Sequence, residues 1–311
     1  MNSTIAIGLG SVEPAPSVVA IGFFDGVHRG HQSLILRASK TAHDRGVRSV
    51  VITFDRHPLE VVNPGARPPL LMTLDQRLRA LAAQPVDLVV AVPFDDDLRH
   101  LSASDFVQHV LAGPVQAQHV VVGGNFRFGH KAAGDVTTLA DLGPVFDFTS
   151  EGVTLLQMDD VVVSSTEIRA ALENGRVEQA ARWLGRPHMV EGIVIRGDQR
   201  GRELGYPTAN LQVNNRAAIP AEGVYAGLFR LPDGTWHPAA SSIGLNPTFG
   251  GVAQIRVEAF LIDWAGDLYG VEAAVDFRHR LRAQVKFDSV EDLITQMAED
   301  VDRARTLLTK P

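Results

Sequence analysis

The stretch that decides the fold is Val18–His31, which reads VVAIGFFDGVHRGH. Its first part, Val18–Phe24, contains only apolar residues and one glycine, and it predicts a buried strand. A short turn follows, and His31–Arg45 has the apolar spacing of a helix that packs one face on a core. A buried strand that leads through a turn into a helix is the repeating unit of a parallel α/β sheet.

Further apolar runs continue this pattern. They are Ser49–Phe54, Asp87–Val92, His119–Val122 and Gly152–Met158, and a second helix is predicted over Gln76–Ala83. Strands that are apolar on both faces and separated by helices are typical of a parallel sheet covered on both sides. We therefore expect an open, doubly wound Rossmann-like α/β domain with its ligand at the carboxyl ends of the strands.

The pattern changes near residue 184. Ser164–Leu184 predicts a helical segment with a possible break at Asn174-Gly175, and Gly185-Arg186-Pro187 ends it. Short alternating strands without helices then predict an antiparallel β-barrel or sandwich: Met189–Arg196, Gly223–Phe229, Ala239–Ile243, Gln254–Ile262 and Val271–Phe277. A last helix is expected from Ser289, packed on the barrel. These patterns divide the 311 residues into two domains, 1–183 and 184–311.

Composition narrows the class of function. The chain has 29 Lys and Arg against 36 Asp and Glu, a net charge of −7, which argues against nucleic-acid or anionic-membrane binding. It has no cysteine, so disulfides, thiolate metal sites and cysteine nucleophiles are excluded. No basic region precedes the first apolar run, and no run approaches the length of a membrane span. We expect a cytoplasmic protein that binds small molecules and needs no protein partner.

The turn between the first strand and the first helix predicts a phosphate site. Free backbone N–H groups and the helix dipole point at such a place, and Gly30 lets a phosphate approach the backbone. His28 and His31 lie about one helical turn apart, so both can face the phosphate and stabilise the charge that builds up when pyrophosphate departs. A zinc site is disfavoured because no third ligand follows.

Three other segments carry weaker signals. Ser164 and Glu167 have the spacing of a capping box, so this segment is either a helix cap or a set of hydroxyl and N–H donors for a triphosphate, with Arg169 adding charge. Asn125 follows a strand, where it suits a base or ring edge, and Phe126 or Phe128 could stack on that ring. His57 also ends a strand, where a structural role and a functional role are equally open.

The second half offers a kinase-like set of residues. The glycine-rich loop Gly197–Asn210 is either a surface loop or a loop that wraps an anion with its N–H groups. If this segment is extended, Thr208 and Asn210 point to the same side and offer oxygen to Mg²⁺. Glu258 interrupts an apolar strand, so it is either paired with a cation or functional. Beside a metal-bound phosphate, its carboxylate could take the proton of an attacking hydroxyl.

These motifs resemble a known family. GFFDGVHRGH, VVGGNFRFGH and VSSTEIR, followed by GRELGYPTANL, SIGLNPTFGG and VEAFLIDWAGDLYG, are similar in order to the prokaryotic bifunctional riboflavin kinase/FMN adenylyltransferases (FAD synthetases). The resemblance covers nearly the whole chain. It implies that the second domain phosphorylates riboflavin with ATP to give FMN, and that the first joins AMP from a second ATP to FMN, giving FAD and pyrophosphate.

The resemblance also implies roles for individual residues. His28, His31 and Glu258 are the expected catalytic groups, and Thr208 and Asn210 are the expected Mg²⁺ ligands. The residues expected to bind ATP are Gly22, Phe24, Gly30, Ser164, Ser165, Thr166, Arg169, Gly197, Gly201, Thr208 and Asn210. Those expected to bind the flavin are His57, Pro58, Asn125, Phe128, Glu203 and Tyr206, with Arg202 shaping the same pocket. The family commonly has proline where Arg56 stands, and this departure affects the flavin side.

Two other functions are compatible with parts of the pattern. In the first, one half is active and the other only senses a flavin or nucleotide, which separate expression of 1–183 and 184–311 would reveal. In the second, the chain is a flavin- or NAD-dependent oxidoreductase. No Gly-x-Gly-x-x-Gly follows any predicted strand, which argues against a dinucleotide-binding oxidoreductase.

Overall fold

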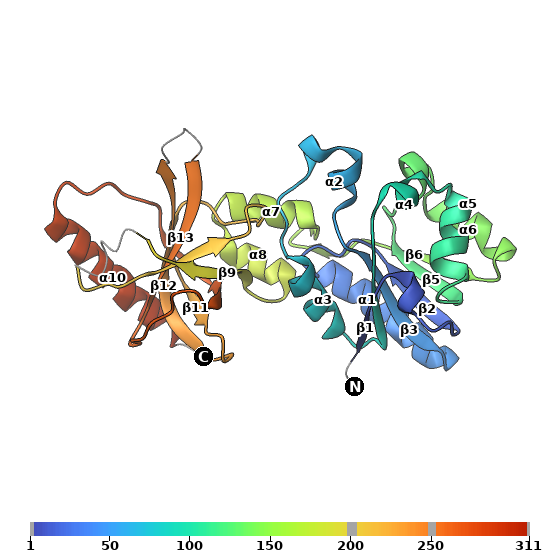
Figure 1. Ribbon diagram of the computed structural model, residues 1–311, viewed down its shortest axis with the longest axis horizontal. Helices are drawn as coiled ribbons and strands as arrows, with labels where there is room; N and C mark the ends of the chain where they lie inside the picture. Colours follow the sequence, from blue (N-terminus) through green and yellow to red (C-terminus); the bar gives the residue numbers. More distant parts are fainter. Residues whose placement is uncertain (1–2, 198–203, 248–252, 310–311) are drawn as a thin grey trace. The chain divides into compact units, whose positions relative to one another are not determined.

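The computed structural model of the chain describes residues 3–197, 204–247 and 253–309. By its internal contacts the chain forms two compact units, Met1–Ser165 and Thr166–Pro311 (Figure 1). Two helices, α7 (Ser165–Glu173) and α8 (Val177–Leu184), therefore group with the second unit, apart from the first residue of α7. The division at 183/184 stays a prediction about where one activity ends and the other begins.

The first unit is built on a parallel sheet, as predicted, and this sheet has six strands in the described residues. Its strand order is β1-β4-β3-β2-β5-β6. The strands are β1 (Thr4–Ile7), β2 (Ser17–Ile21), β3 (Arg48–Phe54), β4 (Leu88–Val92), β5 (Ala117–Gly123) and β6 (Thr149–Val153). Every residue of β2 and β4 is buried, which explains why these strands are continuous apolar runs.

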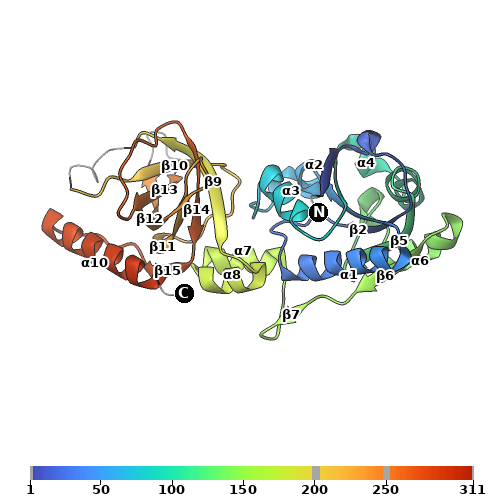
Figure 2. The ribbon, with the colours of Figure 1, turned by 90° about the horizontal axis from the view of Figure 1, so that it is seen from below.

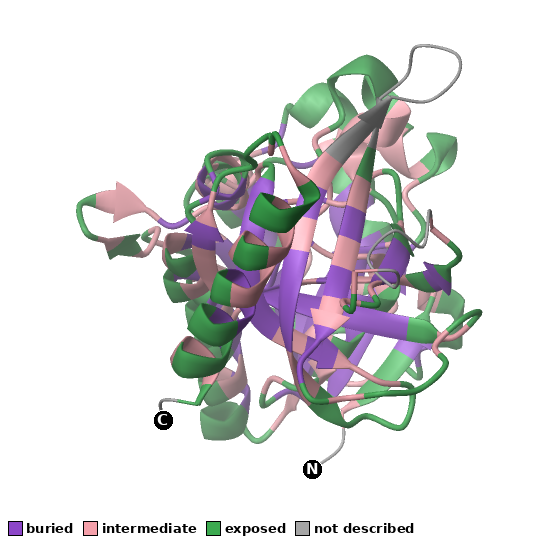
Figure 3. Ribbon diagram, turned by 90° about the vertical axis from the view of Figure 1, so that its left-hand side faces the viewer, coloured by how far each residue is buried: buried purple, intermediate pink, exposed green. Residues whose placement is uncertain are grey.

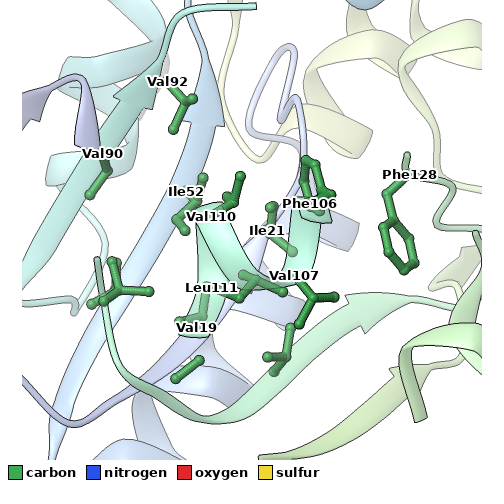
Figure 4. Packing of buried hydrophobic residues seen from close by; sticks show 14 of the residues in the cluster. Val19, Ile21, Ile52, Val90, Val92, Phe106, Val107, Val110, Leu111 and Phe128 are labelled. Carbon is green, nitrogen blue, oxygen red and sulfur yellow. The ribbon is translucent and has the colours of Figure 1, made fainter. Parts of the chain in front are cut away.

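Helices cover both faces of this sheet. On one face α1 (Arg29–Arg45), labelled beside β2 and β5 in Figure 2, and α3 (Leu74–Ala82) bury their apolar residues in one core cluster. On the other face α5 (Ala103–Phe106) and the π-helical turn η3 (Val107–Ala112) contribute to a second cluster (Figure 4). The shorter elements are η1 (Leu9–Ser11), α2 (Pro58–Val62), η2 (Pro64–Ala66), α4 (Asp96–His100), η4 (His130–Ala132), α6 (Val136–Leu142), η5 (Gly143–Val145), β7 (Gln157–Met158) and β8 (Val161–Val162).

The edge strands are where the sequence prediction is wrong. A strand was expected over Gly152–Met158, but β6 ends at Val153 and the chain then turns into the antiparallel pair β7–β8. The outermost strand on the other side, β1, was not predicted at all, although it pairs in parallel with β4. Both edge strands are mostly exposed or half-buried, so they lack the apolar run that marks an inner strand.

The second unit is a closed antiparallel barrel, also as predicted. Six strands pair in the order β12-β13-β10-β9-β14-β11, and a β11–β12 pairing closes the ring, while β15 pairs with β11. The strands are β9 (His188–Ile195), β10 (Ala209–Val213), β11 (Gly223–Arg230), β12 (Trp236–Pro247), β13 (Ala253–Leu261), β14 (Glu272–Phe277) and β15 (His279–Arg282). Both β10 and β15 were missed, because β10 begins inside the segment read as a loop and β15 is short.

Helices complete the second unit. The terminal helix α10 (Val290–Leu308) begins after Ser289, whose side chain accepts a hydrogen bond from the Asp292 N–H, as the sequence predicts. Its buried residues pack on the outer face of β11 and β12 beside Ala226 and Ala240, and its other side is exposed (Figure 3). The predicted break between α7 and α8 is present, with Gly175 at φ 68°. Over the described ranges, no helix is long and apolar enough to cross a membrane.

Two candidate active sites

The first candidate site is the loop between β2 and α1. β2 pairs with β3 on one side and β5 on the other, so the loop leaves the sheet where its strand order reverses, the usual ligand position in this architecture. Phe24 and Val27 have φ values of 56° and 40°. The left-handed region is strained for a branched residue such as Val27, and the complete burial of its side chain holds it there.

The two predicted histidines meet in this loop. Their rings stack with centroids 3.5 Å apart and planes 21° from parallel. His28 Nδ1 accepts a hydrogen bond from the His31 N–H at 3.3 Å, so His28 caps α1, which begins two residues earlier than predicted. Because Nδ1 accepts, the neutral ring of His28 carries its hydrogen on Nε2, where it can donate to a ligand.

His31 is held as a neutral ring. Burial, reinforced by the neighbouring His28, lowers the pKa of His31 well below its ordinary value of 6.5. Although part of the ring is accessible, its Nδ1 is shielded and forms no hydrogen bond to any described residue. The edge of the ring meets Phe24, with centroids 5.2 Å apart. A neutral His31 ring can still donate one hydrogen bond to an anion at neutral pH.

Hydrogen bonds from distant segments fix the loop. The buried Asp25 carboxylate accepts the N–H groups of Leu71 at 3.0 Å and Met72 at 3.1 Å. Ser165 donates its hydroxyl to the Asp25 carbonyl at 2.9 Å, which brings part of the VSSTEIR motif to the loop. Gly30 leaves room for His28, because a Cβ at residue 30 would lie 3.1 Å from His28 Nδ1.

The predicted flavin-side histidine also lies against this loop. His57 contacts Phe23 edge-on, with ring centroids 4.7 Å apart. Its Nδ1 accepts the Leu59 N–H at 3.1 Å and Glu60 accepts the His57 N–H at 2.9 Å, a capping box for α2, whose first residue is Pro58. The structural role of His57 is therefore present, and it leaves Nε2 outside the cap.

Sequence reasoning missed Arg77. Its side chain is 1% exposed, lies 4.1 Å from the centre of the Phe23 ring and donates to the carbonyl of Phe54. Burial lowers its pKa to about 10, so it remains charged at neutral pH. Arg77 thus ties the His28 loop to the end of β3. In the sequence it is one more polar residue of an amphipathic helix, and nothing there signals its burial.

The segment that follows β5 contains both exposed and buried residues. Asn125, just after β5, is exposed. Phe128 is 5% exposed and packs between Phe126 and Phe106, at centroid distances of 5.5 and 5.4 Å (Figure 4). The structure places the ring of Phe128 in the core cluster, and its flavin-binding role stays a prediction. Phe126, which is half-buried, is the ring accessible for stacking.

The second candidate site is a row of side chains across the barrel. Asn210 on β10 lies opposite Glu258 on β13, which in turn lies opposite Ser242 on β12. Opposed residues in antiparallel strands point to the same face. Since the alternate positions Leu211 and Val257 are buried, the row faces outward, and the chemistry of this barrel lies on its outer wall.

Two cavities flank this row. One of about 300 Å³ is lined by Tyr206, Thr208 and Glu258 together with apolar residues of α10. The other, of about 510 Å³, is lined by Gly197, Thr208 and Asn210, and Thr208 therefore lines both. A smaller, more apolar cavity on one side and a larger, glycine-lined one on the other suit two different ligands that meet at Thr208.

The polar atoms at this junction suit a hard cation. Asn210 is 7% exposed and its Oδ1 has no hydrogen-bond donor among the described residues. Arg256 holds one oxygen of the Glu258 carboxylate at 3.2 Å. No cluster of three or more His, Asp or Glu side chains suited to a metal occurs in the described ranges. The predicted site residues Gly201 and Glu203, with Arg202, lie outside the described residues.

The remaining predicted residues follow the elements already described. Gly22 follows β2, and a Cβ there would lie 3.1 Å from the Phe24 ring. Ser164 immediately precedes α7, and Thr166 and Arg169 lie in its first turns. Tyr206 contacts Phe260 edge-on, with centroids 5.2 Å apart, at the wall of the smaller cavity.

Comparison with known proteins matches the two parts of the chain to two different families. Residues 11–167 match the FAD synthetase family and residues 184–308 match the riboflavin kinase family. A bifunctional riboflavin kinase/FMN adenylyltransferase from Pseudomonas fluorescens is 38% identical, with 93% of this chain and 92% of that protein covered. The protein of the same description from Escherichia coli K12 is 35% identical over 98% of both chains.

One solved structure is similar over its whole length. It is described as a macrolide-efflux protein from Streptococcus pneumoniae, and it is 30% identical with a TM-score of 0.87, covering 98% of this chain and 99% of that one. The two family matches follow one another in the same order as the two candidate sites, and the relatives carry the description of both activities. The chain belongs to the bacterial family of bifunctional riboflavin kinase/FMN adenylyltransferases, which make FMN from riboflavin and FAD from FMN.

Proposed function

We propose that each activity has its own site and that the two sites share no catalytic residue. The observation that carries this proposal is their separation along the chain. His28, His31 and Ser165 belong to the unit Met1–Ser165. Thr208 and Glu258 belong to Thr166–Pro311. The scheme needs small-molecule substrates only and no macromolecular partner.

In the first unit the β2–α1 loop carries FMN adenylylation. An oxygen of the FMN phosphate attacks the α-phosphorus of ATP, the new P–O bond forms, and the bond to the β-phosphate breaks so that pyrophosphate leaves. Hydrogen bonds from His28 and the neutral His31 stabilise the charge on the α-phosphate, which is greatest in the transition state. The remaining residues assigned to ATP in this reaction are Gly22, Phe24, Gly30, Ser164 and Ser165, with Thr166 and Arg169 continuing the same motif past the boundary between the two units. Those assigned to the flavin are His57, Pro58 and Asn125.

In the second unit the row on the outer barrel wall carries riboflavin phosphorylation. Glu258 accepts the proton of the riboflavin hydroxyl that attacks the γ-phosphorus of ATP. The smaller, more apolar cavity beside Tyr206 suits the flavin ring, and the larger one beside Gly197 suits the nucleotide. Thr208 and Asn210 would hold Mg²⁺, which fits an Asn210 Oδ1 that accepts no hydrogen bond from any residue the structure describes. When bound, Mg²⁺ neutralises charge on the phosphates.

A complementation experiment tests the separation. His28→Ala and Glu258→Gln chains are each incubated with riboflavin, ATP and Mg²⁺, alone and mixed, and the flavins are separated by chromatography. The first variant should accumulate FMN and the second should leave riboflavin unchanged, whereas the mixture should make FAD because FMN released by one chain reaches the other. If the His28→Ala chain also failed to make FMN, or the Glu258→Gln chain failed to convert added FMN to FAD, the sites would not be independent.

A further inference from the structure

Ser242 occupies a position in the kinase site that the scheme above leaves unused. It lies directly opposite Glu258 in the β12–β13 pairing, and both side chains line the smaller cavity. Directly opposed residues have Cβ atoms about 4.5–5.5 Å apart. An oxygen atom placed between the two side chains can therefore contact both at hydrogen-bond distance.

A second residue fixes the direction of the Ser242 hydroxyl. Gln284 donates its amide nitrogen to Ser242 Oγ at 2.8 Å and to the Ile243 carbonyl at 2.9 Å. A carbonyl oxygen can only accept, so the bond to Ile243 requires the nitrogen, and not the oxygen, of the amide to face β12. Ser242 Oγ must then accept from Gln284, and its own hydrogen is left to point elsewhere.

That hydrogen is available to a substrate. Within the described part of the chain, Ser242 donates to no recorded acceptor, and Gln284 at the exposed rim of the cavity offers it none. Glu258 already has one oxygen held by Arg256. An attacking hydroxyl must donate its hydrogen to the base while its oxygen faces phosphorus, and a donor on one lone pair of that oxygen fixes this orientation.

We infer that Ser242 is a further catalytic residue of the kinase site and that Gln284 is its positioning residue. This inference rests on the proposed role of Glu258. Ser242 donates to the oxygen of the attacking riboflavin hydroxyl, whose own proton passes to Glu258. The other lone pair of that oxygen forms the bond to the γ-phosphorus, the bond to the β-phosphate oxygen breaks, and ADP leaves. Ser242 keeps its hydrogen throughout.

The test separates turnover from binding in the full-length chain. Ser242→Ala should lower kcat for FMN formation about tenfold, the scale for one neutral hydrogen bond, while riboflavin binding measured by flavin fluorescence changes less than about threefold. Ser242→Thr, which keeps the hydroxyl, should recover most of the loss. Gln284→Leu should lower kcat less, and the double variant should be no slower than Ser242→Ala, because Gln284 acts only through Ser242.

Ser241→Ala is the matched control. Ser241 is the neighbouring residue on β12, it faces the barrel interior, and its buried hydroxyl has no recorded partner among the described residues. Riboflavin binding by the same chains reports whether the barrel is folded, and their conversion of FMN to FAD reports whether the first unit is intact. The inference is overturned if Ser242→Ala behaves like Ser241→Ala, if both activities fall together, or if the two single losses add in the double variant.

Glu258→Gln, measured alongside, separates this failure from that of the proposed function. If Glu258→Gln abolishes FMN formation and Ser242→Ala does not reduce it, the role of Ser242 fails while Glu258 stands. If Glu258→Gln keeps its rate, the proposed base is wrong, and the inference about Ser242 falls with it.

Discussion

The two candidate sites of this chain use the backbone in opposite ways. In the parallel sheet of the first unit the candidate site is a loop at a strand end, with Phe24 and Val27 in the left-handed region and His28 capping a helix. In the barrel the candidate site is a row of regular strand positions, Asn210, Glu258 and Ser242, set by register alone.

The difference follows from how each sheet buries its strands. Parallel strands covered on both faces have no free side-chain positions, so chemistry is restricted to the loops where the strands end. An antiparallel barrel buries only its inner face, and every second residue of a strand is free to act on the outer wall. The first arrangement supplies dense backbone donors, whereas the second supplies a carboxylate and amide at fixed spacing.

The largest expected effect is the loss of riboflavin phosphorylation in the second unit. Glu258→Gln keeps the size of the side chain and removes the base, so FMN formation should fall by about 10²- to 10⁴-fold, the usual contribution of general base catalysis. Stopped assays of riboflavin phosphorylation measure this loss. FMN-to-FAD conversion by the same protein should stay within twofold, and a comparable drop in both would mean that the halves are coupled.

The corresponding test in the first unit is the loss of FAD formation on substitution of His28. His28→Ala should reduce FAD formation from FMN by roughly 10²- to 10³-fold, the scale for losing one preorganised donor, with FMN formation unchanged. Because His28 also caps α1, His28→Asn is the informative partner: asparagine caps well but lacks the imidazole. His43→Ala, on the exposed side of the same helix, is the matched control. Full activity in His28→Asn would reduce His28 to a capping role.

This contrast also explains what could be predicted from the sequence. The inner strands of both sheets can be predicted from their sequence pattern. A continuous apolar run indicates a strand buried on both faces, and alternation indicates a strand buried on one face. The edge strand β1 and the start of β10 have no such pattern: β1 is largely exposed, and β10 begins inside the glycine-rich sequence Gly197–Asn210. Register, and with it the alignment of Asn210, Glu258 and Ser242, depends on pairing between distant strands and cannot be predicted from one strand.

Site residues follow the same rule. His28 and His31 were predictable because a local turn brings them together, and the structure adds their stacking and the low pKa of His31. Arg77 and Phe128 were not, since whether a polar residue is buried or an aromatic one faces a ligand depends on segments far away in the chain. Arg77 contacts Phe23 and the end of β3, while Phe128 packs on Phe106.

A pH titration tests how one buried histidine affects the stability of the second unit. Burial lowers the pKa of His188, at the start of β9, to about 4, and its Nε2 donates to the Ala218 carbonyl at 2.7 Å. Below the ordinary value of 6.5 the unfolded chain takes up a proton that the folded chain does not, so stability is complete above pH 6.5 and falls as the pH falls towards 4. The loss should reach about 3 kcal/mol.

Tryptophan fluorescence isolates this effect, because Trp183, Trp236 and Trp264 are the only tryptophans and all lie in the second unit. Urea unfolding followed by this signal between pH 7 and 4 measures the loss. His188→Gln, which keeps an amide donor for Ala218 but does not titrate, should show a shallower dependence on pH. An equally steep dependence in this variant would assign the acid sensitivity to other groups.

The smallest expected effects come from two glycines that make room for a functional side chain. A Cβ at residue 197 would lie 2.5 Å from Asn210 Nδ2, and one at residue 30 would lie 3.1 Å from His28 Nδ1. Each substitution to alanine should therefore displace its neighbour and slow one reaction by about tenfold, with the larger loss for Gly197→Ala in FMN formation and the smaller for Gly30→Ala in FAD formation. Each variant is the control for the other, because its second activity should be unchanged. If Gly30→Ala lowered its rate more than Gly197→Ala did, the distance of the close contact alone would not determine the loss of rate. The strained loop would then tolerate displacement less well than the regular strand.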